Sequence, residues 1–401
     1  MNKISTTART TIPNTSFDTK VSEKYRSILS KIENQFKNNY DKSITIDFED
    51  YPIGEEGENL INTLLAKDKS IISLEFLNTR FKDDDELNLV SILEKNTNIT
   101  TLSLHESKTN FGGFKVIAEL IKSNASIQIQ NLSFGNLDQG STQIIAEALK
   151  VNSSLKELHL NSGFIRAEGA QAIFNALKTN STLVELDLSR NYISADSIKY
   201  IAESLRNNST LNVLKLANIY LYDECAIAIA DALKVNNTLT ELDLGGTGFS
   251  TLGAKHIALA LRENTALKLL DLSQNTIGIE GFVELNNALK NNTTLTKINL
   301  SVNGTDLDMF FDGNYIIADE DSEPNEEPAE KYNENEFLTE YSEIRKLCQR
   351  NSQKELLLAN ALPVLQVLNP EITKDIANLL VRELLNTEAD AATLQRIANL
   401  V

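Results

Sequence analysis

Residues 183–193 read LVELDLSRNYI, and this stretch decides the fold. Around Leu186 and Leu188, apolar residues alternate with polar ones. Alternation of this kind predicts a β-strand that is buried on one face only. Apolar residues then return at helical spacing, at Ile198, Ile201, Ala202 and Leu205. The stretch therefore predicts a half-buried strand followed by an amphipathic helix.

The same pattern recurs along the chain with a constant 28-residue period, as in the step from Leu183 to Leu211. The apolar residue that opens each strand signal is found at Ile71, Ile99, Ile127, Leu155, Leu183, Leu211, Leu239, Leu267 and Leu295. A second column of the same period runs from Asn96 to Asn292. The period also relates Ile46 and Phe48 to Leu74 and Phe76, which extends the phase back by one unit. Columns in register over this length predict a solenoid of stacked strand–helix units.

The asparagine column has a predicted role at the end of each helix. Asn208 follows the last apolar helix position, and a residue such as Thr210 then precedes the next strand. Asparagine tolerates the left-handed backbone conformation that often follows a helix end. We therefore expect this column to stop each helix before the next strand begins.

The pattern Leu183-x-x-Leu186-x-Leu188-x-x-Asn191 resembles that of the leucine-rich-repeat superfamily, and specifically its ribonuclease-inhibitor-type subclass of 28-residue units. The resemblance covers about residues 43–305. It implies an α/β horseshoe with a parallel sheet on the concave side and helices on the convex side. The column of Asn191 also contains Gly163, Ile219 and Thr247. A continuous ladder of buried asparagines is therefore not predicted at this position.

Composition divides the chain into five predicted segments. Residues 1–20 lack an apolar face and are expected to be disordered, with an organelle transit peptide as the alternative. Residues 21–42 carry an apolar helical stripe that suggests an N-terminal cap. The solenoid, of about ten units, spans 43–316. The segment 317–336 is rich in acids and should be a disordered linker. Apolar periodicity returns in 337–401, which predicts a small α-helical bundle that docks on the last repeat, pairs with its own copy or binds another molecule.

Net charge and cysteine content indicate which kinds of partner and cellular compartment suit this chain. The formal net charge is −18, which argues against a nucleic-acid partner and favours a basic or neutral one. Two distant cysteines, Cys225 and Cys348, indicate a reduced chain without a disulfide framework. No apolar run is long enough to cross a bilayer. We expect a cytoplasmic protein, with delivery into a host cell as the alternative.

Two columns of strand residues are predicted to point outward from the concave sheet. The first contains Glu157, Glu185, Val213, Glu241 and Leu269, and the second His159, Asp187, Lys215, Asp243 and Asp271. Beside them, in the loops that leave the strands, Phe164, Tyr192 and Tyr220 are one period apart. Aromatic area next to charge is typical of a protein-binding surface. The alternative is that the rings pack over neighbouring loops and the acids are only solvated.

Residues that carry chemistry are sparse. The run Gly245-Gly246-Thr247-Gly248 resembles a phosphate-binding loop but has no Lys-Ser/Thr after it. The three histidines lie in different repeats with no second ligand four residues on, so no metal site is expected. His159 could form an acid–base pair with Asp187 across strands, without a nucleophile nearby. We expect no cofactor and no catalytic residue.

The sequence thus predicts a non-enzymatic interaction scaffold or regulator that binds a protein on its concave face. One alternative rests on a second resemblance. An array followed by an acidic stretch is similar to the Ran GTPase-activating proteins, which implies a Ran-type small GTPase as partner. The helical segment after the acids departs from that family. An enzyme confined to residues 337–401 is disfavoured, because the segment has no histidine and one cysteine, Cys348.

Overall fold

The computed structural model describes residues 27–28, 30–32, 35, 42–48, 54–67, 69–77, 86–105, 111–123, 126–132, 137–301, 303, 342–344 and 346–351. The strands of this part of the chain are β1 (Ser43–Asp47), β2 (Ser73–Leu77), β3 (Thr101–His105), β4 (Ile129–Asn131), β5 (Glu157–His159), β6 (Glu185–Asp187), β7 (Val213–Lys215), β8 (Glu241–Asp243), β9 (Leu269–Asp271) and β10 (Lys297–Asn299). The helices between them are α2 (Gly54–Lys67), α3 (Glu86–Lys95), α4 (Phe111–Lys122), α5 (Gln139–Val151), α6 (Ala167–Leu177), α7 (Ile198–Asn207), α8 (Tyr222–Leu233), α9 (Thr251–Glu263) and α10 (Gly278–Leu289), with a short 3₁₀ turn, η1 (Ala195–Ser197), before α7.

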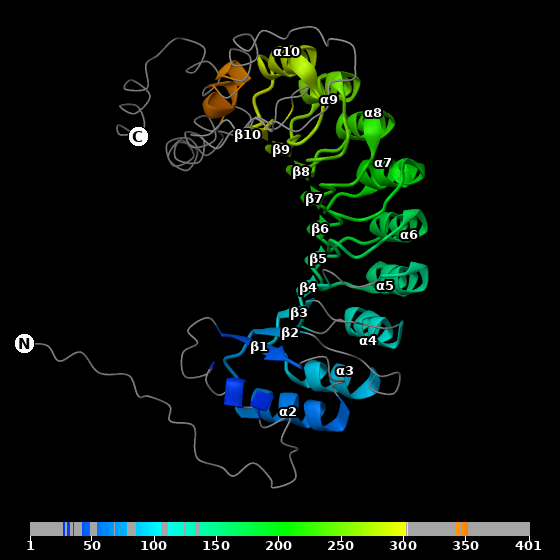
Figure 1. Cartoon of the computed structure of the whole chain (residues 1–401), viewed down its shortest axis with the longest axis vertical. Helices are drawn as coiled ribbons and strands as arrows, with labels where there is room; N and C mark the ends of the chain where they lie inside the picture. Colours follow the sequence, from blue (N-terminus) through cyan, green and yellow to red (C-terminus); the bar gives the residue numbers. More distant parts are fainter. Residues whose placement is uncertain are drawn as a thin grey trace, which may run out of the picture.

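The strands form one parallel sheet whose order follows the sequence from β1 to β10. The sheet curves so that its strands line the inner side and the helices the outer side (Figure 1). This confirms the predicted α/β solenoid with a concave sheet. Among the described residues, no helix is long and apolar enough to cross a membrane.

The 28-residue period is kept from β2 to β10, as in the pairing of Glu157 with Glu185. The backward extension of this period by one unit is wrong. Ile44, and not Ile46, pairs with Leu74, so the first unit is two residues longer than the others. A shift of two residues preserves the alternation of side chains across a strand. Ile44, Ile46 and Phe48 are therefore all buried despite the longer unit.

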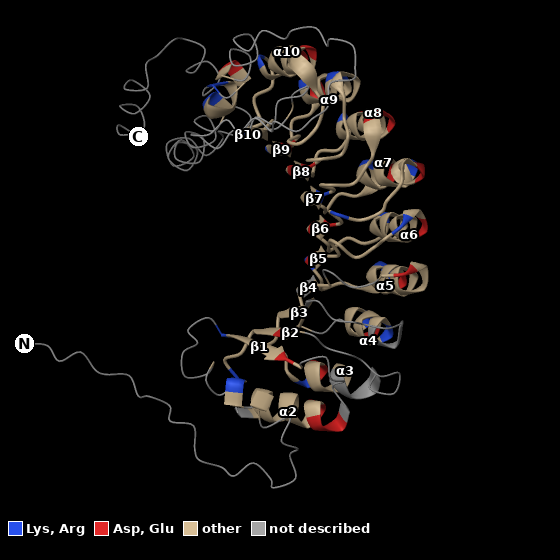
Figure 2. Cartoon of the chain, in the orientation of Figure 1, with Lys and Arg blue, Asp and Glu red and all other residues tan. Residues whose placement is uncertain are grey.

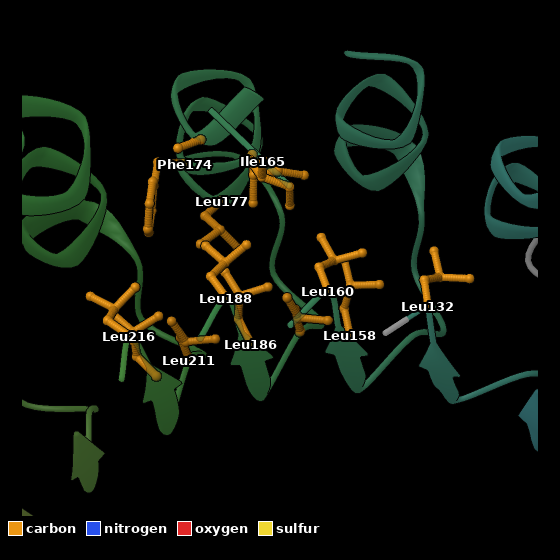
Figure 3. Close-up of a cluster of buried hydrophobic side chains, with 14 of the residues drawn as sticks. Leu132, Leu158, Leu160, Ile165, Phe174, Leu177, Leu186, Leu188, Leu211 and Leu216 are labelled. Carbon is orange, nitrogen blue, oxygen red and sulfur yellow. The ribbon is translucent and has the colours of Figure 1, made fainter. Parts of the chain in front are cut away.

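Each repeat buries its strand leucines against its own helix and its neighbours. Leu186 of β6 and Leu188, which follows the strand, are fully buried and point toward α6, which carries Phe174 and Leu177 (Figure 3). These residues belong to one continuous apolar cluster that runs along the solenoid. No single unit could bury its apolar face alone, so stability comes from stacking.

The asparagine column stabilises the stack by a different route from the one expected. Asn208 has an extended backbone, with φ −83° and ψ 132°, and is not left-handed. Its side chain reaches into the preceding repeat, where Nδ2 donates to the carbonyl oxygens of Leu177 (2.8 Å) and Asn180 (3.2 Å). Its Oδ1 accepts from the backbone N–H groups of Thr210 (2.9 Å) and Leu211 (2.7 Å). The same donation to a carbonyl 31 residues earlier recurs at Asn152, Asn180, Asn236, Asn264 and Asn292.

The column of Asn191 is interrupted, as the sequence suggested. Asn191 Oδ1 accepts from the backbone N–H groups of Gly163 and Ile165 in the preceding repeat. Asn275 does the same for Thr247 and Phe249. The continuous ladder of buried asparagines is therefore the one at the helix ends.

The first strand has a partner at its open edge. Thr45 N–H donates to Gln35 Oε1 (3.0 Å), and Gln35 Nε2 donates to Thr45 O (2.8 Å). Ile28 and Ile32, on the same predicted helical stripe, are buried in the main cluster. These contacts cover an edge that would otherwise expose unpaired backbone groups. The N-terminal segment 1–20 lies outside the described residues, so its predicted disorder stays a prediction.

Residues 342–344 and 346–351 are helical and contact the last complete repeat. Ile344 and Cys348 are buried in the main cluster. Arg350 Nη2 donates to the carbonyl oxygen of Asn292 (3.0 Å), and Asn351 Nδ2 donates to that of Leu295 (2.7 Å). In a further repeat, the helix-ending asparagine would donate to this same carbonyl oxygen of Asn292. Arg350 and Asn351 therefore take the place of that asparagine at the end of the solenoid. The acidic linker 317–336 and the remainder of 337–401 lie outside the described residues.

Candidate functional site

The predicted outward columns do lie on one face of the sheet. Leu186 is buried, and its neighbours Glu185 and Asp187 are half-buried on the opposite, concave side. Register places the equivalent residues of adjacent strands side by side. Charged residues accordingly follow one another along the inner edge of the curve (Figure 2).

Lys215 divides the acidic stripe into two parts. Its Nζ donates to Glu185 Oε1 at 2.7 Å. Burial disfavours the charged form of Lys215, but the hydrogen bond to Glu185 and the charges of Glu185, Asp187 and Glu241 outweigh it, so the pKa of Lys215 lies above its ordinary value. Lys215 is thus charged at neutral pH and neutralises Glu185.

The predicted pair of His159 with Asp187 is wrong. The two residues are in register, but His159 Nε2 lies 3.4 Å from Glu185 Oε1 and 3.8 Å from Glu157 Oε2. Asp187 instead turns along its own strand, because its Oδ1 accepts from the backbone N–H of Ser189 (2.8 Å). The neighbours of His159 are therefore the two glutamates.

Two aspartates lie beyond Lys215 on β8 and β9. Asp243 Oδ1 accepts from the backbone N–H of Gly245 (3.0 Å). Asp271 accepts from Ser273 N (2.8 Å) and Ser273 Oγ (2.5 Å) through Oδ1, and from Asn299 Nδ2 (2.7 Å) through Oδ2. Asp271 is therefore held rigidly, whereas Asp243 keeps an oxygen for other partners.

The surroundings of Asp243 disfavour the charged form of its carboxyl group. Burial is the largest cause that raises its pKa above the ordinary value, and the negative charges of Asp271 and Asp187 add to it. A carboxyl whose folded pKa is raised lowers stability as pH rises through the interval from its unfolded to its folded pKa. Asp243→Asn is therefore expected to raise the melting temperature at pH 7, and the gain should vanish below the unfolded pKa of about 4. Melting curves over this range check it, and a gain that persists at low pH would contradict it.

The loops that leave β5, β6 and β7 carry exposed rings. Phe164 is 53% exposed, Tyr192 64% and Tyr220 73%, so the rings are not hidden beneath neighbouring loops. Tyr222, at the start of α8, is a fourth exposed ring that sequence reasoning missed, because serines occupy its column one period before and after. The ring centroids of Phe164 and Tyr192 are 5.6 Å apart, and those of Tyr220 and Tyr222 6.3 Å. We call these four residues the aromatic ridge.

Two residues of the aromatic ridge have backbones in the left-handed region, with φ 61° at Phe164 and φ 57° at Tyr222. This conformation costs a non-glycine residue about 1–2 kcal/mol. The same conformation occurs at Ser162, Arg190, Asn218 and Gln274, so it is a general feature of the loops that leave the strands.

The sequence profile of the family described as Leucine Rich repeat matches residues 151–174, 179–202 and 235–258. The chain is a leucine-rich-repeat protein. Among curated proteins, no sequence matches it significantly.

Several solved structures are similar to this leucine-rich-repeat protein. Actin-binding site 2 of leiomodin-1 is 19% identical, with 54% of this chain and 95% of that chain covered and a TM-score of 0.34. The tropomodulin C-terminal domain of Caenorhabditis elegans is 13% identical, with coverage of 55% and 96% and a TM-score of 0.34. An internalin of Listeria monocytogenes is 18% identical, with coverage of 70% and 89% and a TM-score of 0.38. Values this low indicate nothing about what this chain binds.

The glycine-rich run of this leucine-rich-repeat protein forms a turn. Gly246 has φ 64°, and a Cβ there would lie 2.7 Å from Asn218 Oδ1, so both backbone conformation and space require glycine. The two cysteines are buried, and burial raises the pKa of Cys225 to about 12 and that of Cys348 to about 11. Neither thiol is suited to act as a nucleophile at neutral pH.

Proposed function

We propose that this leucine-rich-repeat protein is a protein-binding scaffold or regulator whose contact surface combines the aromatic ridge with the acids of the concave sheet. The observation that carries the proposal is the row of four exposed rings on adjacent loops. Large exposed apolar areas on a folded domain mark interaction sites, and aromatic residues supply most of the binding energy at such interfaces.

The carboxylates beside the ridge favour a basic partner. Asp187, Glu241 and Asp243 lie next to Lys215, whose hydrogen bond is already made with Glu185. Complementary charge on the partner would speed association and fix its orientation. Burial, and after it the charges of Asp271 and Asp187, raise the pKa of Asp243, and a bound cation would stabilise its charged form. The chain's net charge of −18 favours the same class of partner.

The proposal is tested by affinity capture from cell lysate. The intact chain is compared with a variant that carries Tyr192→Ala, Tyr220→Ala and Asp243→Lys. We expect the variant to lose one or more captured proteins, because hot-spot rings each contribute about 2 kcal/mol or more. A matched control, Val235→Ala with Leu252→Ala and Glu94→Lys, removes exposed apolar and acidic groups from the helical side and should capture the same proteins as the intact chain. Equal capture by all three proteins would contradict the proposal.

GTPase activation for a Ran-type small GTPase remains the alternative. No group in the described residues specifically favours it. Incubation of the purified chain with GTP-loaded Ran-type GTPase, with phosphate release as the readout, decides between the two functions. The ribonuclease-inhibitor-type subclass, self-association through 337–401 and a cytoplasmic location likewise remain predictions.

A further inference from the structure

The N-terminal end of the concave stripe contains a cluster that the protein-binding proposal does not use. Glu157 and His159 are two residues apart on β5 and therefore lie on the same face. Glu185 of β6 is in register with Glu157. One candidate ligand atom from each of the three side chains lies within 4.8 Å of the others.

The imidazole of His159 has no hydrogen-bond partner for Nε2 in the described structure, although this atom is buried. A buried polar atom without a partner costs about 1–3 kcal/mol. The nearest acceptors, Glu185 Oε1 at 3.4 Å and Glu157 Oε2 at 3.8 Å, are farther than a normal N–H···O bond of about 2.7–3.2 Å. The three groups therefore lie close together, although no hydrogen bond engages His159 Nε2.

These separations suit a shared ion. Zinc binds imidazole nitrogen and carboxylate oxygen at about 2.0–2.2 Å in tetrahedral geometry, so two of its ligand atoms lie about 3.4 Å apart. The distance from His159 Nε2 to Glu185 Oε1 has this value, 3.4 Å, and the distance to Glu157 Oε2 is slightly longer, at 3.8 Å. The candidate ligand atoms of Glu157 and Glu185 also lie within 4.8 Å of each other.

We propose that Glu157, His159 and Glu185 bind a divalent transition-metal ion of the zinc class. Imidazole and carboxylate together are a donor set that such ions accept, and three protein ligands leave a coordination position open to solvent or to a partner's side chain. The sequence does not reveal this site, because its ligands are not four residues apart on one helix. Glu185 comes from the repeat after the one that holds Glu157 and His159. The site does not depend on the proposed protein-binding function.

Lys215 gives the proposal a directional test. Its Nζ is 2.7 Å from Glu185 Oε1 and competes with the ion for this carboxylate. Removing the cation with Lys215→Met therefore strengthens binding of a metal ion. If the cluster served only as an ion pair of His159 with the two glutamates, neither the unaltered chain nor the Lys215→Met variant would bind a metal ion saturably.

The experiment is titration of the purified full chain with ZnCl₂, followed by isothermal calorimetry and by the melting temperature. We expect saturable binding of one ion and a higher melting temperature. His159→Gln, Glu157→Gln and Glu185→Gln should each weaken binding by at least about tenfold, and Lys215→Met should strengthen it. The controls His256→Gln and Glu241→Gln change a histidine and a glutamate outside the cluster and should bind as the unaltered chain does. Circular dichroism verifies that each variant is folded. Absence of saturable binding, or a His159→Gln variant that binds zinc as tightly as the unaltered chain, would overturn the proposal.

Discussion

Asn208→Ala is expected to lower the free energy of unfolding by about 3–5 kcal/mol, because it leaves several buried backbone groups without partners at once. The side chain satisfies the carbonyl oxygens of Leu177 and Asn180 and the N–H groups of Thr210 and Leu211. All lie at the junction between two repeats, where water has little access. Urea unfolding followed by circular dichroism measures the loss.

The neighbouring residue provides the control. Asn207 has the same side chain but is exposed, and its Nδ2 donates only to Glu203 O within its own helix (2.7 Å). Asn207→Ala should change the free energy of unfolding by about 0.5 kcal/mol or less. Equal losses for the two substitutions would show that the ladder does not stabilise the stack.

Phe174→Ala is expected to cost about 3–5 kcal/mol, the usual range for removing a buried aromatic ring. Phe174 is fully buried in α6 and belongs to the main apolar cluster, with the strand leucines on the same side of the helix (Figure 3). Surrounding structure relaxes only partly around such a deletion, so a cavity remains. The midpoint of urea unfolding should therefore fall sharply.

Phe164, ten residues earlier, is predicted to behave in the opposite way. It is 53% exposed and has φ 61°. Phe164→Gly should leave stability unchanged or raise it, because glycine adopts this conformation without strain. The same substitution should reduce capture of the partner, since it removes a ring from the aromatic ridge. A large loss of stability at Phe164 would mean that this ring belongs to the core and not to a binding surface.

Most of the fold could be predicted because the same apolar pattern recurs every 28 residues. A leucine such as Leu186 is identified as a core residue by its own strand and again by every other repeat. The exceptions are local. The first unit is two residues longer, and only the backbone pairing of Ile44 with Leu74 reveals this. The helix-ending asparagines were placed correctly but for the wrong reason, because their bonds join residues 31 apart that no local pattern connects.

The site could be predicted less well, because it depends on which way each side chain turns. Register alone places His159 beside Asp187, but the hydrogen bond from Ser189 N–H draws Asp187 away and leaves His159 between two glutamates. Tyr222 was missed because it has no counterpart one period away. The 28-residue period does not predict residues that differ from their column. Such residues nevertheless determine which side chains meet on the surface.

The 28-residue period is the structural unit of this fold, and deletion of one unit tests this most directly. Removing residues 209–236 joins Asn208 to Asn237 and keeps every column in register, whereas removing 223–236 deletes half a period and most of α8. Circular dichroism and thermal melting of both proteins are compared with those of the unaltered chain. We expect the full-period deletion to retain cooperative unfolding and native helical signal, because each repeat contacts only its neighbours. The half-period deletion should lose both. Cooperative folding of the half-period protein, or unfolding of the full-period protein, would contradict the account.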